Sequence, residues 1–324
     1  SPVHPSGERA AFLETRSLTR SGTSMPELPD ITVYVESLEA RIKGRRLEKV
    51  RVGNPFILRT FDPPLIAVSH KTVKAIERIG KRIILALEDD FFVMIHLMIA
   101  GRFHWKQPSF KLPGRIGAAA FDFPDGTLLL TEASTKKRAS IHLVKGRSSL
   151  AAFDRGGLEV LGSSVKSFSA TLMRENRTLK RALTDPRLFS GIGNAYSDEI
   201  LHRARMSPLT LTLNLSLEEA ARLHSATIQT MEEWIKRLRS EAGGEFPEKV
   251  TAFRQEMTVH GKFGKPCPVC GTKVQRIVYA ENESNYCPRC QTDGKILSDR
   301  SLARLLKGDW PKTIDELEQS ELGK

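Results

Sequence analysis

The stretch Cys267–Cys290, CPVCGTKVQRIVYAENESNYCPRC, decides the fold of the C-terminal region. It contains two Cys-X-X-Cys pairs separated by sixteen residues, which include the β-like segment TKVQRIVYA. Two such pairs at this separation are typical of a hairpin that holds zinc through four thiolates. Because four thiolates leave no open coordination position, we expect one structural Zn²⁺, bound by Cys267, Cys270, Cys287 and Cys290. A redox role for the two pairs is the alternative.

The composition of the rest of the chain indicates a basic globular protein. The 324 residues are 40% hydrophobic, which is enough for a core and favours two domains over one. Lys and Arg outnumber Asp and Glu by 50 to 38, and the net charge of +12 points to a polyanionic partner, first of all nucleic acid. The longest apolar run, residues 91–100, is far shorter than the roughly 20 residues of a membrane span. Since all four cysteines lie in the two pairs, a reducing compartment is expected.

The N-terminal half has the pattern of one helix followed by an antiparallel β-sandwich. Apolar residues at helical spacing follow Asp30 and stop at Gly44. Residues 118–123 and 127–133 flank Pro124-Asp125-Gly126, a strong hairpin signal. Further strands are predicted at residues 47–52, 72–79, 82–87 and 91–97.

The second half is predicted to be helical. Ser216-Leu217-Glu218-Glu219 forms a capping box, and Gly243-Gly244 ends the helix that it starts. In FSGIGNAYSDEI, residues 189–200, Gly191 and Gly193 allow a tight turn whose N–H groups could meet a phosphate, although an ordinary corner between helices explains the turn equally well. The predicted divisions are 1–24 (disordered extension or tag remnant), 25–148 (β-sandwich), 149–255 (helical), 256–297 (four-cysteine zinc finger) and 298–324 (C-terminal tail).

The Met-Pro-Glu-Leu-Pro segment at Met25, the GIGN turn and the terminal four-cysteine finger together resemble the formamidopyrimidine-DNA glycosylase / endonuclease VIII family of base-excision repair enzymes. The likeness runs from Met25 to about Gln291. It implies an α+β protein in which an N-terminal β-sandwich domain and a C-terminal helical domain, with a helix-two-turn-helix and a zinc finger, hold damaged DNA between them. The target nucleotide is then flipped into a pocket.

The resemblance also implies catalytic residues. Pro26 matches the N-terminal proline whose amine attacks the sugar C1′, expels the base and forms a Schiff base that leads to strand cleavage. An α-amino group titrates near pH ~8, so an appreciable fraction of it is unprotonated at neutral pH. Glu27 matches the acid that protonates the opening deoxyribose, and Lys81, in RIGKRIIL, matches a lysine that contacts phosphate and assists the final elimination.

The DNA contacts of the family fall on four further positions. His96, Lys180 and Asn194 match residues that hold phosphates of the damaged strand, which positions the lesion without reading sequence. Asn282 stands where the family usually has a phosphate-binding arginine, so either another cation such as Arg276 substitutes or binding there is weaker. Glu199 matches a family position near the pocket.

Three segments depart from the family pattern. Ile99 replaces a common methionine, and TEASTKKRASIHL, residues 131–143, has no aromatic wedge in place of the expected Arg-Phe turn. The segment of residues 243–256 is shorter than the region that caps oxidised guanine in the formamidopyrimidine branch of the family, which favours a pocket of the endonuclease VIII type or an unusual one.

We therefore expect a bifunctional DNA glycosylase and AP lyase that acts on oxidised bases or abasic sites as a monomer, without a membrane partner. It would act in the cytoplasm if bacterial and otherwise in the nucleus or mitochondrion. The chemistry requires a free Pro26 amine, so residues 1–24 are interpreted as vector-derived or as a misassigned start. A homologue that binds damaged or structured DNA without cleaving it is the main alternative, and an RNA-binding zinc-ribbon protein is a third.

Overall fold

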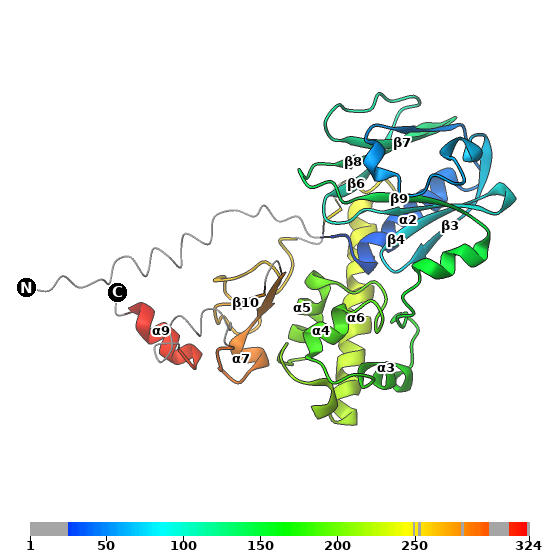
Figure 1. The fold of residues 1–324 in the computed structure, drawn as a ribbon. Helices are drawn as coiled ribbons and strands as arrows, with labels where there is room; N and C mark the ends of the chain where they lie inside the picture. The colour runs from blue at the N-terminus through cyan, green and yellow to red at the C-terminus, as the bar shows by residue number, and fades with distance from the viewer. Residues whose placement is uncertain (1–24, 249, 252–253, 280–281, 298–310, 323–324) are drawn as a thin grey trace, which may run out of the picture.

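The computed structural model describes residues 25–248, 250–251, 254–279, 282–297 and 311–322. Figure 1 shows a β-sandwich domain above a helical domain, with a small β-hairpin unit at the side of the helical domain. The α+β class is therefore the predicted one. The predicted extension, residues 1–24, and residues 298–310 of the predicted tail lie outside the described residues.

Two antiparallel sheets form the upper domain. Among the described residues, one sheet has five strands in the order β1-β3-β4-β5-β9 and the other has four in the order β2-β7-β8-β6. The bounds of the first sheet are β1 Arg46–Leu47, β3 Lys71–Ile79, β4 Arg82–Leu87, β5 Phe91–His96 and β9 Ser140–Lys145. Those of the second are β2 Lys49–Val52, β7 Gly117–Phe123, β8 Gly126–Glu132 and β6 Gly101–Lys106.

The segment predicted as a single strand at residues 47–52 belongs to both sheets. Leu47 pairs with Lys71 in the first sheet, whereas Lys49 pairs with Asp122 in the second. Between them, Glu48 donates its N–H to the carbonyl of Asp122 at 2.9 Å. The prediction of one strand was wrong because a chain that crosses between sheets keeps the local pattern of a strand while it changes its partner.

Strand β4 shows how the sheet buries both of its faces. Ile83 and Leu85 belong to the core between the two sheets. Ile84 and Ala86, on the opposite face, pack with Leu150 from the 3-10 helix η4 (Arg147–Phe153) that covers them. Period-2 alternation sends successive side chains to opposite faces, so a continuous apolar run fits a strand that is covered on both sides.

Helix α2 (Leu28–Ile42) joins the two domains. Tyr34 and Leu38 are fully buried in the core of the sandwich, while Leu28 is buried in the core of the helical domain. The backbone N–H of Leu28 also donates to the carbonyl of Gly191 at 2.9 Å. The start of α2 is therefore fixed to the lower domain and its remainder to the upper one.

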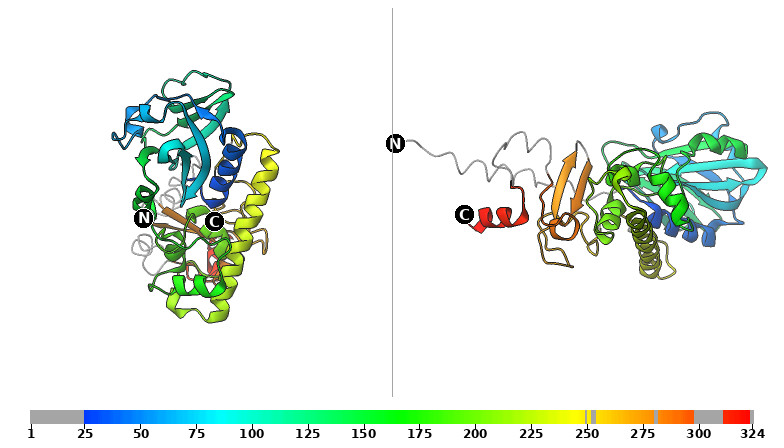
Figure 2. Two further views of the ribbon diagram at one scale, coloured as in Figure 1. Left: turned by 90° about the vertical axis from the view of Figure 1, so that its right-hand side faces the viewer. Right: turned by 90° about the horizontal axis from the view of Figure 1, so that it is seen from below.

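Four helices build the lower domain: α3 Val165–Leu172, α4 Leu179–Thr184, α5 Asn194–Arg203 and α6 Leu217–Ala242. Helix α6 begins at the predicted capping box, in which Ser216 and Glu219 each accept the other's backbone N–H, and it ends at Gly243 with φ 55°. Figure 2 shows the upper end of α6 beside α2, where Arg239 pairs with Glu36 at 2.6 Å. This contact ties the two domains together a second time.

The C-terminal hairpin consists of β10 (Gln275–Tyr279) and β11 (Asn282–Tyr286), followed by the short helix α7 (Pro288–Gln291). Helix α9 (Ile314–Leu322) adjoins it, since Ile314 donates its N–H to the carbonyl of Gly294 at 2.8 Å. None of the helices in the described ranges has the length and apolar character needed to cross a membrane.

Candidate active site and zinc centre

The first turn of α5 binds the carboxylate of Glu27 from the other domain. Gly193, Ala195 and Tyr196 donate their backbone N–H groups to it at 2.6, 2.9 and 3.3 Å. Such N-terminal donors have no partner within the helix, and the helix dipole favours negative charge there. We predicted that this turn could meet a phosphate. That interpretation is wrong for these three N–H groups, because the carboxylate of Glu27 already accepts them.

The close approach at this turn requires a glycine at position 193. A Cβ atom on Gly193 would lie 2.3 Å from Nζ of Lys81 and 2.5 Å from Oε1 of Glu27. Two of the predicted catalytic side chains therefore converge on one backbone position of the GIGN turn. Burial lowers the pKa of Lys81, and the nearby carboxylate of Glu27 partly offsets this.

A second carboxylate holds the backbone next to Pro26. Asp30 is fully buried, and its Oδ2 accepts the backbone N–H of Glu27 at 2.9 Å. Burial raises the pKa of Asp30 to about 6, although the guanidinium of Arg254, 4.0 Å from Oδ1, opposes the rise. Asp30 thus orients the peptide that carries both Pro26 and Glu27.

A cleft of about 670 Å³ opens beside this peptide, between the two domains. Met25, Lys81 and His96 line it, whereas Pro26, the next residue after Met25, is buried and is not part of the lining. Four arginines, Arg82, Arg155, Arg181 and Arg187, also line it. They outnumber the two aspartates of the lining, Asp154 and Asp185, so the cleft is basic, although Arg187 pairs with Asp185 at 2.7 Å.

None of these four arginines was predicted as a site residue from the sequence. They come from separate parts of the chain, and the only signal that they leave in the sequence is the excess of basic residues. The basic lining is what an electrostatic site for a polyanion requires.

His96 lies at the end of β5 opposite Arg82 and faces this cleft. Burial lowers its pKa to about 4, and the positive charges of Arg82 and Lys81 add to the effect. The imidazole is therefore neutral at pH 7 and offers a hydrogen bond rather than a charge.

Lys180, predicted as a phosphate ligand, is bound within the protein. Its ammonium group donates to the carbonyl of Asn194 at 2.7 Å, to Oγ of Ser197 at 2.8 Å and to Oδ1 of Asp198 at 2.5 Å. A lysine has three N–H donors, so a phosphate contact from Lys180 would replace one of these bonds. Asp198 is fully buried and also accepts from His260 on the segment that leads into the hairpin, at 2.8 Å.

The two predicted asparagine contacts lie close to each other in the fold. Asn194, the first residue of α5, donates from Nδ2 to the carbonyl of Glu283 on β11 at 2.8 Å. The neighbouring Asn282 is the first residue of β11, but its side chain lies outside what the structure describes. Arg276, considered as a substitute cation, pairs with Glu283 at 3.3 Å and stacks on the ring of Phe263 at 4.3 Å.

The last turns of α5 hold the segment before the zinc hairpin. Glu199 accepts the backbone N–H groups of Thr258, Val259 and His260 at 2.8 to 2.9 Å. It lines a second, smaller cavity behind the hairpin and is absent from the residues that line the basic cleft. Its structural part is to fix the hairpin unit to α5.

The four predicted cysteine ligands gather at the base of the hairpin. Sγ of Cys267 lies 3.9 Å from Sγ of Cys290, and Sγ of Cys270 lies 3.4 Å from Sγ of Cys287. Tetrahedral zinc with Zn–S bonds of about 2.3 Å separates its sulfur ligands by about 3.8 Å. The donor set therefore fits one zinc ion, which has a structural part because a hairpin of this size cannot hold itself together.

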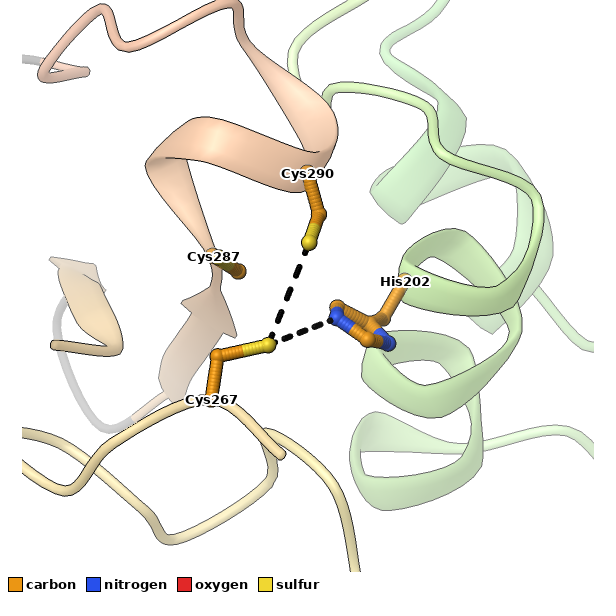
Figure 3. Close-up of side chains that lie close together, drawn as sticks. All are labelled: His202, Cys267, Cys287 and Cys290. Atoms are coloured by element: carbon orange, nitrogen blue, oxygen red, sulfur yellow. Dashed lines mark hydrogen bonds between the residues drawn. The ribbon is translucent and has the colours of Figure 1, made fainter. Parts of the chain in front are cut away.

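His202 is a further donor that the sequence interpretation missed. It lies on the last turn of α5, and its Nε2 is 3.4 Å from Sγ of Cys267 (Figure 3). A histidine 65 residues before the first cysteine has no finger-like spacing, so no motif could have linked the two.

Two of the segments that differ from the family pattern, residues 131–143 and 243–256, contact the β-sandwich domain. In the short segment after α6, Phe246 is buried in the sandwich core and Glu248 bonds to His104 and Lys106. In the loop that replaces the Arg-Phe turn, the buried carboxylate of Glu132 accepts the N–H groups of Arg138 and Ala139 at 2.7 and 2.9 Å. The type of pocket stays a prediction.

Three successive parts of the chain match known domain families. Residues 25–141 match the formamidopyrimidine-DNA glycosylase N-terminal domain and residues 159–243 match the formamidopyrimidine-DNA glycosylase H2TH domain. Residues 264–292 match the zinc finger found in FPG and IleRS. These matches coincide with the β-sandwich, the helical domain and the hairpin, and the last of them agrees with one structural Zn²⁺ at the donor cluster.

Similar proteins cover nearly all of this region. The formamidopyrimidine-DNA glycosylase of Solibacter usitatus (strain Ellin6076) is 32% identical over 276 residues, which are 82% of this chain and 99% of that protein. The formamidopyrimidine-DNA glycosylase of Ligilactobacillus salivarius (strain UCC118) is 30% identical over 282 residues, with the same coverage.

Solved structures give the same result. A Lactococcus lactis FPG mutant in complex with Fapy-dG containing DNA superposes with a TM-score of 0.73 at 27% identity, covering 82% of this chain and 100% of that one. The Lactococcus lactis Fpg in complex with an abasic site containing DNA has a TM-score of 0.73 at 26% identity, covering 82% and 99%. With the domain order, the sequence identity and the fold in agreement, the chain belongs to the formamidopyrimidine-DNA glycosylase family of base-excision repair enzymes.

Proposed function

We propose that this protein is a bifunctional DNA glycosylase and AP lyase that acts on oxidised bases and abasic sites through the nitrogen of Pro26. One observation carries the proposal: Met25, which is bonded to Pro26, lines an interdomain cleft together with Lys81, and Lys81 lies beside the carboxylate of Glu27. The similar structures that hold Fapy-dG or abasic-site DNA support this choice of substrate.

Pro26 can act as a nucleophile only in a chain that begins at this residue. Met25 lines the cleft and is bonded to the Pro26 nitrogen, which is an amide in the chain as described. Removal of everything before Pro26 would leave a secondary amine where Met25 now enters the cleft. Such an amine titrates near pH ~8, so part of it carries a free electron pair at pH 7.

In the proposed reaction, the Pro26 amine attacks C1′ of the flipped nucleotide. The bond from C1′ to the base breaks, and the base leaves with the electron pair of that bond and takes up a proton. Opening of the deoxyribose then forms an iminium between Pro26 and C1′, with Glu27 as the group that protonates the ring oxygen. Loss of a proton from C2′ and departure of the 3′ phosphate cleave the strand, and Lys81 assists this elimination.

The basic cleft supplies the DNA-binding part of the proposal. Arg82, Arg155 and Arg181, together with Lys81, can neutralise several phosphates and release their counterions, whereas Arg187 already pairs with Asp185. Both walls of the cleft come from one chain, so we infer that the protein acts as a monomer. The site of action would be the cytoplasm for a bacterial protein.

Borohydride trapping on abasic-site DNA tests the proposal, since reduction converts the iminium into a stable cross-link. Protein that begins at Pro26 is expected to cross-link, the Pro26→Gly variant to lose most of the product, and protein that keeps residues 1–25 to give none. A panel of oxidised bases in single- and double-stranded DNA then defines the substrate.

A catalytically silent DNA-binding homologue is the second candidate. Asn282, which stands where the family pattern predicts a phosphate-binding arginine, favours it. If protein with a mass-verified Pro26 terminus binds abasic-site DNA but yields no adduct, this second function replaces the first.

A further inference from the structure

Five donor atoms, one more than tetrahedral zinc needs, surround the zinc position. Cys267, Cys287 and Cys290 form a compact group with His202, in which all four ligand atoms lie within 4.8 Å of one another. Figure 3 shows the ring of His202 pointing from α5 toward Sγ of Cys267. The fourth thiol, Cys270, contacts the same cluster through Cys287 at 3.4 Å.

Two complete ligand sets therefore share three cysteines. Cys270 supplies the fourth ligand of one set, and His202 supplies the fourth ligand of the other. For zinc with Zn–S near 2.3 Å and Zn–N near 2.0 Å, a sulfur and a nitrogen ligand lie about 3.5 Å apart, which is close to the 3.4 Å between Cys267 and His202. Both Cys₄ and Cys₃His are common structural zinc sets.

The two competing donors differ in their surroundings. Cys270 is exposed, whereas Cys267 and Cys287 are buried. His202 is only 6% exposed and is held by α5, whose neighbouring Glu199 fixes the segment that precedes Cys267. The thiol that chemical modification reaches first is thus the one for which a second donor is in place.

We propose that His202 is a reserve ligand of the structural zinc: when the thiolate of Cys270 is lost, Nε2 of His202 takes the fourth position and the metal stays bound. The imidazole would bind as its tautomer with the proton on Nδ1. The consequence is that the four cysteines are unequal, and Cys270 alone is dispensable for zinc. This inference concerns the metal and does not depend on the chemistry of Pro26.

Zinc content and cobalt spectra of the full chain test the proposal. The variants are Cys270→Ala, Cys287→Ala as the buried matched control, His202→Phe, and the double variant Cys270→Ala/His202→Phe. Zinc is measured by mass spectrometry of the metal after dialysis. The same proteins reconstituted with Co²⁺ report the ligand type through their charge-transfer and visible absorption bands.

We expect one zinc per chain in Cys270→Ala and in His202→Phe, and none in Cys287→Ala. The double variant should lose zinc affinity by at least about tenfold relative to Cys270→Ala, measured by competition with a chromophoric chelator. In Cys270→Ala the Co²⁺ charge-transfer band should weaken in the ratio of three thiolates to four, and the visible bands should move to shorter wavelength as nitrogen replaces sulfur.

Three results would overturn the proposal. Cys270→Ala could lose zinc as completely as Cys287→Ala does, or the double variant could retain zinc as well as Cys270→Ala does. Loss of zinc in His202→Phe alone would make the histidine a required residue instead of a reserve. Retained near-ultraviolet circular dichroism of the β-sandwich domain separates each of these results from general misfolding.

Discussion

The two ends of helix α5 carry out the same task by different means. At its first turn, backbone N–H groups bind the carboxylate of Glu27 and so hold the β-sandwich domain. Along its later turns, the side chains of Asp198, Glu199 and His202 hold the zinc hairpin and the segment before it. One helix of ten residues thus positions both the proposed catalytic peptide and the zinc hairpin.

The two junctions would fail in different ways. Backbone N–H groups are present whatever the side chains are. The first junction therefore depends on the absence of a side chain at Gly193, which lets Glu27 and Lys81 approach the turn. The second junction depends on side chains and on a metal, and it fails when a donor or the metal is removed.

Removal of zinc should have the largest effect. Structural zinc supplies about 10–16 kcal/mol of binding free energy, which is far more than an isolated two-stranded hairpin provides. We expect chelation to abolish binding of abasic-site DNA, measured by fluorescence anisotropy, and to open residues 264–297 to proteolysis. The β-sandwich should keep its thermal transition. Unchanged DNA affinity in metal-free protein would contradict the dependence of the second junction on zinc.

Gly193→Ala should break the first junction. The new Cβ would lie 2.3 Å from Nζ of Lys81 and 2.5 Å from the carboxylate of Glu27, so both must move. A displacement of about 1 Å at a catalytic group costs on the order of 100-fold in rate, and we expect this loss in cleavage of abasic-site DNA. Gly114→Ala is the matched control, because nothing lies within 4 Å of its Cβ position. Equal activity of the two variants would contradict the prediction.

Asp30→Asn should change the pH dependence of stability. The pKa of Asp30 is raised to about 6, so its protonated form favours the fold at low pH and this contribution is lost as the pH rises through 6. From pH 4 to pH 7 the variant should therefore gain up to about 3 kcal/mol in unfolding free energy relative to the parent. Urea unfolding at several pH values measures this gain.

Asp125→Asn is the control for that experiment, since its carboxylate is 55% exposed beside Arg45. If the difference between Asp30→Asn and the parent protein stays constant from pH 4 to pH 7, the buried carboxylate is not the group responsible.

Arg181→Gln should have the smallest effect, because it alters the cleft between the junctions and neither junction itself. Arg181 lines the basic cleft and is exposed. We expect DNA affinity to fall a few-fold and the slope of log Kd against log salt to decrease by about 1. Arg45→Gln, outside the lining of the cleft, should leave the slope unchanged. An equal change in both variants would mean that Arg181 contacts no phosphate.

Several features of the fold and of the zinc centre could be predicted from short motifs, because each depends on residues that are neighbours in the sequence. The Cys-X-X-Cys pairs, the capping box at Ser216 and the Pro124-Asp125 turn each act through neighbouring residues, and the structure has all three. The strand at residues 47–52 was misread because its two halves find partners in different sheets. The arginines of the cleft were missed because separate segments bring them together.

The order of nearby residues was sufficient for the α+β class and the zinc finger, and the resemblance carried by the Met25 segment, the GIGN turn and the finger was sufficient for the family. The catalytic roles of Pro26 and Glu27 stay proposals. Only folding in three dimensions showed that Glu27 occupies the GIGN turn, that Lys180 is bound to Asp198 and that His202 stands beside Cys267. These contacts join residues 18 to 166 positions apart. The packing of α5 against Glu27, α4 and the zinc hairpin creates them, and no pattern within a single segment encodes that packing.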